Sequence, residues 1–469
     1  MAIAGVIALA GTLAFAPAAR AQGTKAPTGK CTLNVSFGRS VLVKLPSGQG
    51  NSFLGGGVVA RCPSQSLTLR SDSLESYGDE GRLYFIGHVD YVEPRLSLKS
   101  DFLTYFQRDE RILAVQNVNA RLPTGSTLKG PQAEFFRAVA KIRPQQSATA
   151  TGRPTVGLVE KDPKGKPQPP VKVTGNTIWM VGDSIVSAQG NVIVVRPELT
   201  ATGDSLYADA GKGLLRLMRQ PRIVGTKGRP FTLIGETIDL LTKNRKLDRV
   251  LAKSIADATS EDLDLQSDSI DLRIVDDQLQ RAIAWGRSRA RARSLSQSIV
   301  ADSIDVLLPG QRVREMHAVR GAVADALPDS TKFRTTEKDR LTGDTIVAHF
   351  DSIPAKDTTH RPRIRQLVAV GHATSLQHLA PKDTSLRLPA INYITGRLIT
   401  VSFDSAKITS VQVTEKAGGV YAEPDPDPAK ATTGGPPASP PATPPGTPAS
   451  TPSTTPATPA RPTLTPRRP

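Results

Sequence analysis

The sequence has little of what a metal site requires. Of its 469 residues only two are cysteines, Cys31 and Cys62, and no histidine lies close to either. Two cysteines without neighbouring histidines do not complete a zinc site. Neither the Asp-x-Asp-x-Asp-Gly loop nor the Gly-Gly-x-Gly-x-Asp repeat of calcium sites occurs. We therefore expect no metal ion and no other cofactor.

Catalytic motifs are also missing. The sequence contains no His-Glu-x-x-His and no serine in a Gly-x-Ser-x-Gly elbow. Its acidic residues recur at equivalent places of a repeat described below, which indicates a structural role because a catalytic pair occurs once. We expect that the protein is not an enzyme, and a carbohydrate-cleaving β-solenoid is the least favoured alternative. The histidines are His88, His317, His349, His360, His372 and His378.

Long apolar runs are confined to the amino terminus. Residues 1–21 are mostly small and apolar and end in Ala19-Arg20-Ala21, an A-x-A cleavage pattern. They predict a secretory signal peptide. Because no Lys or Arg precedes the apolar run, a transmembrane anchor remains the alternative. No other segment approaches the roughly 18 apolar residues of a membrane helix, so we expect an exported, soluble mature protein.

The two cysteines suit an oxidising compartment. Cys31 and Cys62 are compatible with one disulfide that closes the first hairpin. Two free buried thiols are the alternative.

Aromatic residues and helical patterns are scarce. Aromatics make up 4% of the chain, whereas glycine and proline number 38 each. Only residues 213–218 and 277–283 look locally helix-capable, and both are shorter than a usual helix. This composition favours many short strands and turns with a modest core per repeat. We predict an all-β protein.

One pattern organises the chain. In Leu96–Tyr105, apolar residues alternate up to Ser100, Asp101 follows, and the alternation resumes on the opposite parity. Period-two alternation predicts a half-buried strand, and a parity swap inside it predicts a bulge or sharp bend. The small residue allows a tight turn, and the carboxylate can accept hydrogen bonds from amides released from the ladder. Further copies centre on Ser71-Asp72, Gly130-Pro131, Gly182-Asp183, Gly203-Asp204, Gly235-Glu236, Ala252-Lys253, Ser267-Asp268, Ala301-Asp302, Gly343-Asp344 and Phe403-Asp404.

The repeats divide the chain into segments. We predict a first repeat block over 31–142 and a second over 171–422. Residues 143–170 are rich in Pro and Lys and predict a linker or loop. Residues 423–469 consist mainly of Pro, Thr, Ala and Gly, a composition that cannot offset its ordering entropy, so we expect a disordered tail.

The charge points to anionic partners. The formal net charge is +17, of which about +15 belongs to the strand-rich body. A body this basic favours phosphorylated lipid or an acidic polymer. We expect no nucleic-acid partner, because export disfavours it and no RNA-binding, helix-turn-helix or zinc-finger signature is present.

Repeats of the form Leu-x-Leu-x-Ser-Asp-x-Leu-x-Tyr alternate with strands that contain Gly-His-Val or Gly-Asn-Val, behind a predicted signal peptide. This order of repeats resembles the OstA-like (LptA) family of lipopolysaccharide transport. The likeness is strongest over 66–136 and 175–240. The resemblance implies an elongated stack of antiparallel strands folded into an open V-shaped β-jelly roll. It also implies that the acyl chains of lipopolysaccharide lie between two sheets. The protein would join other transport components, or further copies of itself, through strand edges. Its location would be the periplasm, in association with the outer membrane. The chain is longer than a single bridge subunit and lacks the strands of a translocon barrel.

If two such sheets enclose an apolar trough, the inward-facing residues of their strands are expected to line it. The alternative is that the same residues pack against one another as core. At the rim, basic residues can meet lipid phosphates or form solvated strand faces. A structural or adhesive repeat protein that binds no lipid is the alternative function. The predicted lining residues are Leu83, Phe85, Val89, Tyr91, Leu96, Leu98, Leu103 and Tyr105, and the rim residues are Arg82, Arg95 and Lys99.

Overall fold

The computed structural model describes residues 33–424, apart from 79, 107, 140–141, 160–169, 183, 245, 262, 295–296, 329–332, 352–361, 384–386 and 405–406. The predicted signal peptide (1–21), Cys31 and residues 425–469 of the predicted tail lie outside the described residues. The strand-rich unit ends at Glu423.

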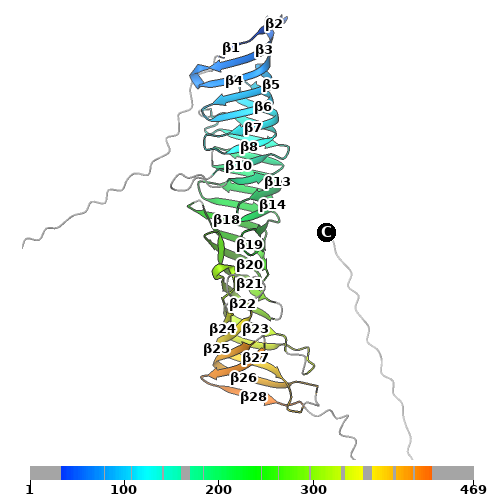
Figure 1. Cartoon of the computed structure of the whole chain (residues 1–469), viewed down its shortest axis with the longest axis vertical. Coiled ribbons are helices and arrows are strands. Elements are labelled where there is room, and N and C mark those ends of the chain that lie inside the picture. The colour runs from blue at the N-terminus through cyan, green and yellow to red at the C-terminus, as the bar shows by residue number, and fades with distance from the viewer. Residues whose placement is uncertain are drawn as a thin grey trace, which may run out of the picture. The chain divides into compact units, whose positions relative to one another are not determined.

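The described residues confirm the all-β prediction. They form 28 strands, which pair antiparallel in one continuous sheet, and two single-turn 3₁₀ helices. Figure 1 shows the strands stacked in chain order. The first half comprises β1 Asn34–Ser36, β2 Arg39–Lys44, β3 Gly50–Cys62, η1 Pro63–Gln65, β4 Leu67–Tyr77, β5 Arg82–Glu93, β6 Leu96–Phe106, β7 Arg111–Arg121, β8 Thr127–Phe136, β9 Ser147–Thr151, β10 Thr155–Leu158, β11 Val171–Thr174, β12 Thr177–Val181, β13 Ile185–Val195 and β14 Leu199–Asp209. The second half comprises β15 Leu214–Met218, β16 Arg222–Gly225, β17 Phe231–Ile234, β18 Thr237–Lys243, β19 Lys246–Ser260, β20 Asp264–Val275, β21 Gln278–Arg293, β22 Gln297–Leu307, η2 Pro309–Gln311, β23 Glu315–Ala326, β24 Asp339–Phe350, β25 Ile364–Leu379, β26 Ala390–Asp404, β27 Lys407–Thr414 and β28 Gly418–Ala422.

The long strands bend once, as the parity swaps predict. Between β5 and β6 the pairing register shifts, so that Gly87 and His88 together lie opposite Asp101. Gly87 and His88 have φ values of 78° and 44°, the left-handed conformation that lets a strand turn sharply. Similar shifts occur at β3, β7, β13, β19, β23 and β25.

The bends divide the sheet into two facing halves. Arm 1 contains the strand segments that continue the ladder of residues 82–86, and arm 2 contains those that continue the ladder of residues 89–93. We call the line of bends the spine. We call the opposite side, where the turns of the two arms meet, the mouth.

Two of the predicted corners were wrong. Gly182 lies in the turn between β12 and β13, and Phe403 pairs with Ile408 at the end of the β26–β27 hairpin. The bend of β26 lies instead at Arg397, where its pairing with β25 shifts. A small residue followed by a polar residue serves a hairpin turn as well as a bend, so this pair alone does not distinguish the two.

The prediction of a linker over 143–170 needs correction. Within it, β9 pairs with β8 and β12, while β10 pairs with β8 and β11, so the sheet continues across this segment. The inward residues of β9 are only Ala148 and Ala150, between outward threonines and serine. Such small residues give a weak hydrophobic alternation, which explains the error. Residues 160–169 lie outside the described part.

Candidate functional site

The structure brings the eight predicted lining residues together from both arms. All are buried, with at most 8% of their surface exposed. They therefore form part of the core in this conformation, the alternative left open for them by the sequence. Arm 1 supplies Leu83, Phe85, Leu103 and Tyr105, and arm 2 supplies Val89, Tyr91, Leu96 and Leu98.

Beside the spine, large and small side chains alternate along arm 1. From β18 to β26, each inward Ile pairs laterally with an Ala of the next strand. Because the arms converge at the spine, this alternation lets facing layers interdigitate without voids. The interior beside the spine is therefore filled. The row contains Ile238, Ala252, Ile270, Ala284, Ile304, Ala318, Ile346, Ala369 and Ile399, each at most 1% exposed.

Space remains at the mouth. Three small cavities, of about 40, 50 and 40 Å³, lie between inward residues of arm 1 and arm 2. Cavity 1 is lined by residues that include Leu96, Leu128 and Phe135. Cavity 2 includes Phe231, Leu263, Leu279 and Leu308. Cavity 3 includes Ile299, Leu341, Leu367 and Phe403. Leu96 is thus the predicted lining residue that reaches cavity 1.

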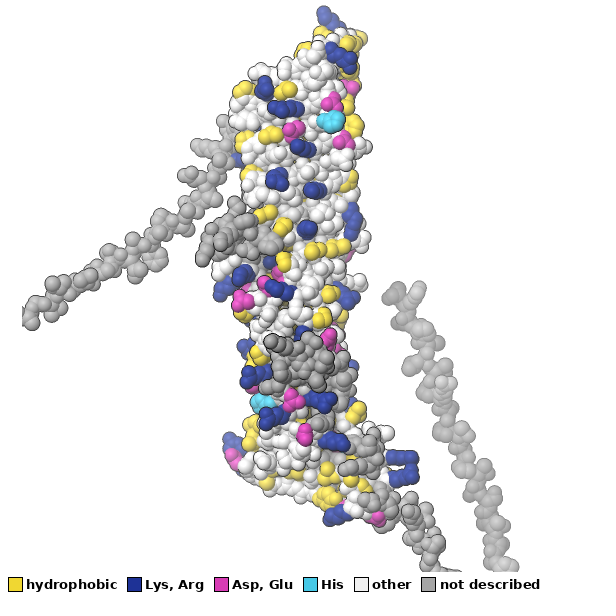
Figure 2. All heavy atoms as spheres, viewed as in Figure 1, with side chains coloured by type: hydrophobic (Ala, Val, Ile, Leu, Met, Phe, Trp, Pro, Cys, Tyr) yellow, Lys and Arg dark blue, Asp and Glu magenta, His cyan; other side chains and the backbone are white. Residues whose placement is uncertain are grey.

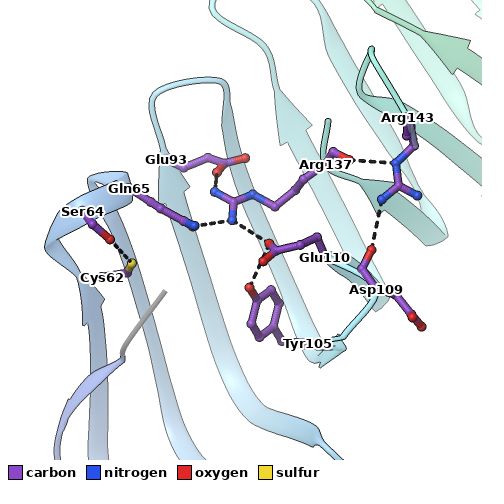
Figure 3. A network of polar contacts seen from close by, with 9 residues as sticks. All are labelled: Cys62, Ser64, Gln65, Glu93, Tyr105, Asp109, Glu110, Arg137 and Arg143. Atoms are coloured by element: carbon purple, nitrogen blue, oxygen red, sulfur yellow. Dashed lines mark hydrogen bonds and ion pairs between the residues drawn. The ribbon is translucent and has the colours of Figure 1, made fainter. Parts of the chain in front are cut away.

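A polar network joins the two arms in front of cavity 1 (Figure 3). Arg137, just after β8 in arm 1, donates hydrogen bonds to Glu93 and Gln65, which belong to the end of β5 and to η1 in arm 2. It also donates to Glu110 Oε2 at 3.1 Å, and Glu110 accepts a further bond from Tyr105 at 3.2 Å. We call Gln65, Glu93, Glu110 and Arg137 bridge 1.

Bridge 1 is largely withdrawn from solvent. The side chains of Arg137 and Glu93 are only 14% and 9% exposed. Burial, followed by the negative charge of Glu110, raises the pKa of Tyr105 to about 12. Burial also raises the pKa of Tyr91 well above its usual value. Burial lowers the pKa of Arg137, but Tyr91 and Glu93 more than compensate and raise it overall, so Arg137 is positively charged at every physiological pH.

A second network crosses the mouth in front of cavity 2. Gln311 of η2, in arm 1, accepts a hydrogen bond from the amide of Arg229 at 2.9 Å and donates one to the carbonyl of Lys227 at 3.3 Å. Lys227 also pairs with Asp277 in the β20–β21 turn of arm 1, at 2.8 Å. Lys227 and Arg229 belong to the β16–β17 turn of arm 2. We call Lys227, Arg229, Asp277 and Gln311 bridge 2.

Sequence reasoning did not identify either bridge. The bonded residues of bridge 1 lie 27 to 72 positions apart, and those of bridge 2 lie 50 to 84 apart. A turn position is the one local signal that these residues share, because all the turns of one arm reach the mouth.

The three predicted rim residues are not brought together. Arg82 begins β5 at the edge of arm 1, where it pairs with Glu80 at 3.6 Å and lies over the Phe106 ring. Arg95 lies in the β5–β6 turn of arm 2. Lys99 is exposed between buried Leu98 and Ser100, so it faces outward beside the spine rather than lying at the mouth.

The acidic corner residues form hydrogen bonds that stabilise the bends of the spine. Asp268 accepts hydrogen bonds from the amides of Arg287 and Ser288, as predicted for amides released from the ladder. Asp72 and Asp101 instead contact the side chains of His88 and Asn117, which belong to the next bent strand. These contacts fit the structural role expected from their recurrence.

Charged side chains are distributed over the outer surface. Figure 2 shows Lys and Arg interspersed with Asp and Glu on the visible face. On the outside of arm 1, Asp239 binds both Arg216 and Lys253, and its side chain is 6% exposed. Burial raises the pKa of Asp239, but the hydrogen bonds from the two cations outweigh it and lower the pKa overall.

Cys62 is fully buried and disulfide-bonded. Cys31, the only other cysteine of the sequence, lies outside the described residues.

Within the described ranges, no group of three His, Cys, Asp or Glu side chains is placed to bind a metal ion. The same part of the chain has no helix with the length and apolar character of a membrane span.

No family model matches this chain, and no curated protein matches its sequence.

Proposed function

We propose that this protein acts in the periplasm as a lipopolysaccharide transport or binding protein, which shields acyl chains between its two arms on the way to the outer membrane. The observation that carries the proposal is the apolar interior between two arms, which no strand pairing joins at the mouth within the described residues. Cavities recur along this mouth in three places. A lipid can enter such an interior sideways, because its head group stays in water while its chains move between the arms.

Lipid binding requires the mouth to widen. The cavities hold about 40 to 50 Å³, which is far smaller than an acyl chain needs. Each methylene that leaves water contributes about 0.8 kcal/mol. Transfer of a whole chain therefore offsets the loss of several contacts at the mouth, whereas the strands that run through the bends keep the arms joined.

The surface charge supports an anionic lipid as the ligand. The strand-rich body carries about +15, and Arg or Lys side chains bind phosphate oxygens through charge-assisted hydrogen bonds. Lipopolysaccharide or another anionic lipid fits this charge.

Partners join through the ends of the stack in this proposal. Among the described residues, β1 and β2 pair only with β3 at one end, and β27 and β28 pair only with β26 at the other. In this part of the chain each end strand thus offers an edge without a strand partner. Val41, Leu42 and Val420 are at least 61% exposed there. Such edges accept strands from other transport components or from a second copy.

Lipid capture by the mature protein tests the proposal. The protein is purified from cells, and mass spectrometry identifies lipid bound to it. Leu122 lines cavity 1 and is half-buried. Leu122→Arg is expected to reduce the amount of bound lipid several-fold and to leave the circular dichroism spectrum unchanged. Phe85 is a poor test position because it is fully buried, and an Arg there would unfold the sheet.

A matched control separates capture from surface effects. Ile255→Arg places the same charge at an exposed position in the bend of β19, on the spine and away from the mouth, and is expected to leave lipid binding unchanged. Protein that is consistently empty of lipid, and that takes up none from vesicles in vitro, contradicts the proposal.

A second candidate is a structural or adhesive repeat protein that binds no lipid. The filled interior beside the spine favours it, because a self-packed stack is stable without a ligand. Consistently empty protein in the same experiment supports this candidate.

A further inference from the structure

Each polar bridge lies directly in front of an apolar cavity. Glu93 and Arg137 of bridge 1 belong to the lining of cavity 1. Arg229 and Gln311 of bridge 2 belong to the lining of cavity 2. The bridges share no residue and lie on different strands, since bridge 1 spans β3 to β8 and bridge 2 spans β16 to β23. The combination of bridge and cavity has thus arisen twice along the mouth.

We propose that cavities 1 and 2 are two separate entry sites for a lipid acyl chain, and that bridges 1 and 2 are the closures of these sites. This inference rests on the proposed function for its ligand. The mouth then opens locally at either place, rather than along the whole stack at once.

The chemistry of cavity 1 fits an acyl chain. Its inner lining comes from side chains such as Leu96, Leu128 and Phe135, whereas Glu93 and Arg137 provide polar atoms at its edge. An amphiphile has the same order of groups, with an apolar chain below a polar head. Cavity 2 repeats the order, with Leu263 and Leu279 inside and Glu261 and Arg229 at the edge.

The bridges are suited to open because they are not part of the sheet. Gln65, Glu110 and Arg137 lie in turns or just beyond strand ends, and Glu93 is the last residue of β5. Breaking their side-chain bonds leaves every strand pair intact. The stack therefore loses a few hydrogen bonds when the mouth opens, and these are replaced by bonds to water.

Bridge 2 has the same character. Lys227 and Arg229 lie in the turn between β16 and β17, and Asp277 lies in the turn between β20 and β21. Gly228 has φ 76°, and a Cβ at this position would clash with the side-chain amide of Gln311. The turn thus approaches η2 closely without any backbone ladder between them.

Accessibility of an introduced thiol to a maleimide reports on each site without lipid. Ala148→Cys places a thiol in the lining of cavity 1 and is the first reporter; Ala282→Cys places one in the lining of cavity 2 and is the second reporter. Both alanines are buried. Each reporter is combined with Arg137→Gln, which removes bridge 1, and with the double variant Lys227→Gln/Gln311→Asn, which removes bridge 2.

The control variant is Arg219→Gln. It removes an exposed ion pair with Asp204 at the spine, 3.3 Å long, and leaves the mouth unchanged. We expect Arg137→Gln to accelerate labelling of the first reporter about tenfold or more and to leave the second reporter unchanged, because hydrogen bonds to charged groups are the stronger ones. The bridge 2 variant is expected to do the reverse, and the control neither.

Equal acceleration at both reporters would show general loosening, and no acceleration would show that the bridges do not cover the cavities; either result overturns the proposal.

Phosphatidylglycerol vesicles with a trace of fluorescent-acyl lipid supply the ligand test. Captured lipid is expected to slow labelling of both reporters. If lipid is captured but protects neither reporter, the entry sites are wrong while the proposed function stands. If no form captures lipid from the vesicles and the protein purified from cells is also empty, the proposed function itself fails.

Discussion

The Nδ1 atom of His88 lies 2.7 Å from Oδ2 of Asp72, and His372 repeats the arrangement with Asp344 at 3.0 Å. In both places the histidine follows a glycine in the left-handed region, and the carboxylate comes from the bend of the preceding strand. The spine thus carries the same contact near both ends of the stack.

Stability should depend weakly on the protonation of His88. The hydrogen bond to Asp72, and then its negative charge, raises the pKa of His88 above 6.5. A raised folded-state pKa contributes stability that is present below the unfolded pKa and is lost as pH rises through the folded one. The effect is small because both side chains are mostly exposed. NMR titration of His88 measures the shift. Asp72→Asn should return the pKa toward its usual value, whereas Asp344→Asn should leave it unchanged.

Gly87 should not tolerate a side chain. Its φ of 78° disfavours other residues, and a Cβ there would clash with the Asp72 carboxylate. Gly87→Ala is expected to lower the free energy of unfolding by about 1–3 kcal/mol in chemical denaturation. Adding Asp72→Ala should recover only the part that comes from the clash. A Gly87→Ala protein as stable as the wild type would show that the bend adapts freely.

The row beside the spine should tolerate exchange of volume but not addition. Ala284→Leu inserts volume between Ile270 and Ile304 and is expected to cost about 1–3 kcal/mol. Ile270→Ala leaves a cavity and is expected to cost about 2–5 kcal/mol. The double variant Ile270→Ala/Ala284→Ile keeps the total volume, so its loss in denaturant titrations should be well below the sum of the two single losses. Strict additivity would contradict direct packing between these residues.

Alkaline pH should weaken the mouth near bridge 1. The pKa of Tyr105 is raised to about 12, so this tyrosine favours folding below pH 10, its usual pKa, and the contribution is lost as pH rises from about 10 through about 12. Tyrosinate absorbance during a pH titration should show late-titrating tyrosines, among them Tyr105 and Tyr91, and Tyr105→Phe should reduce the amplitude of this late part. The same variant loses the hydrogen bond to Glu110, which costs about 1 kcal/mol. A late part that is equally large in Tyr105→Phe would place Tyr105 in water.

Alternation predicted the strands and much of the interior, because the side-chain period of a strand is fixed by its geometry. Phe85 and Leu98 face inward as their parity requires. Alternation did not predict β9, because its inward residues are two alanines. It also did not separate the turn at Gly182 from a bend, because both have the same composition. Bridge 1 was beyond its reach, since the pairing of Gln65 with Arg137 depends on how several hairpins stack rather than on any local pattern.

Each strand pairs only with near neighbours in the chain. Neighbouring strands are about 4.8 Å apart, so every hairpin inserted into or removed from the sequence changes the length of the strand-rich unit by about 10 Å. Its cross-section stays the same, because the described strands contact only strands that are near them in the chain. The length of the strand-rich unit can therefore change by whole hairpins while the structure of the two arms stays the same.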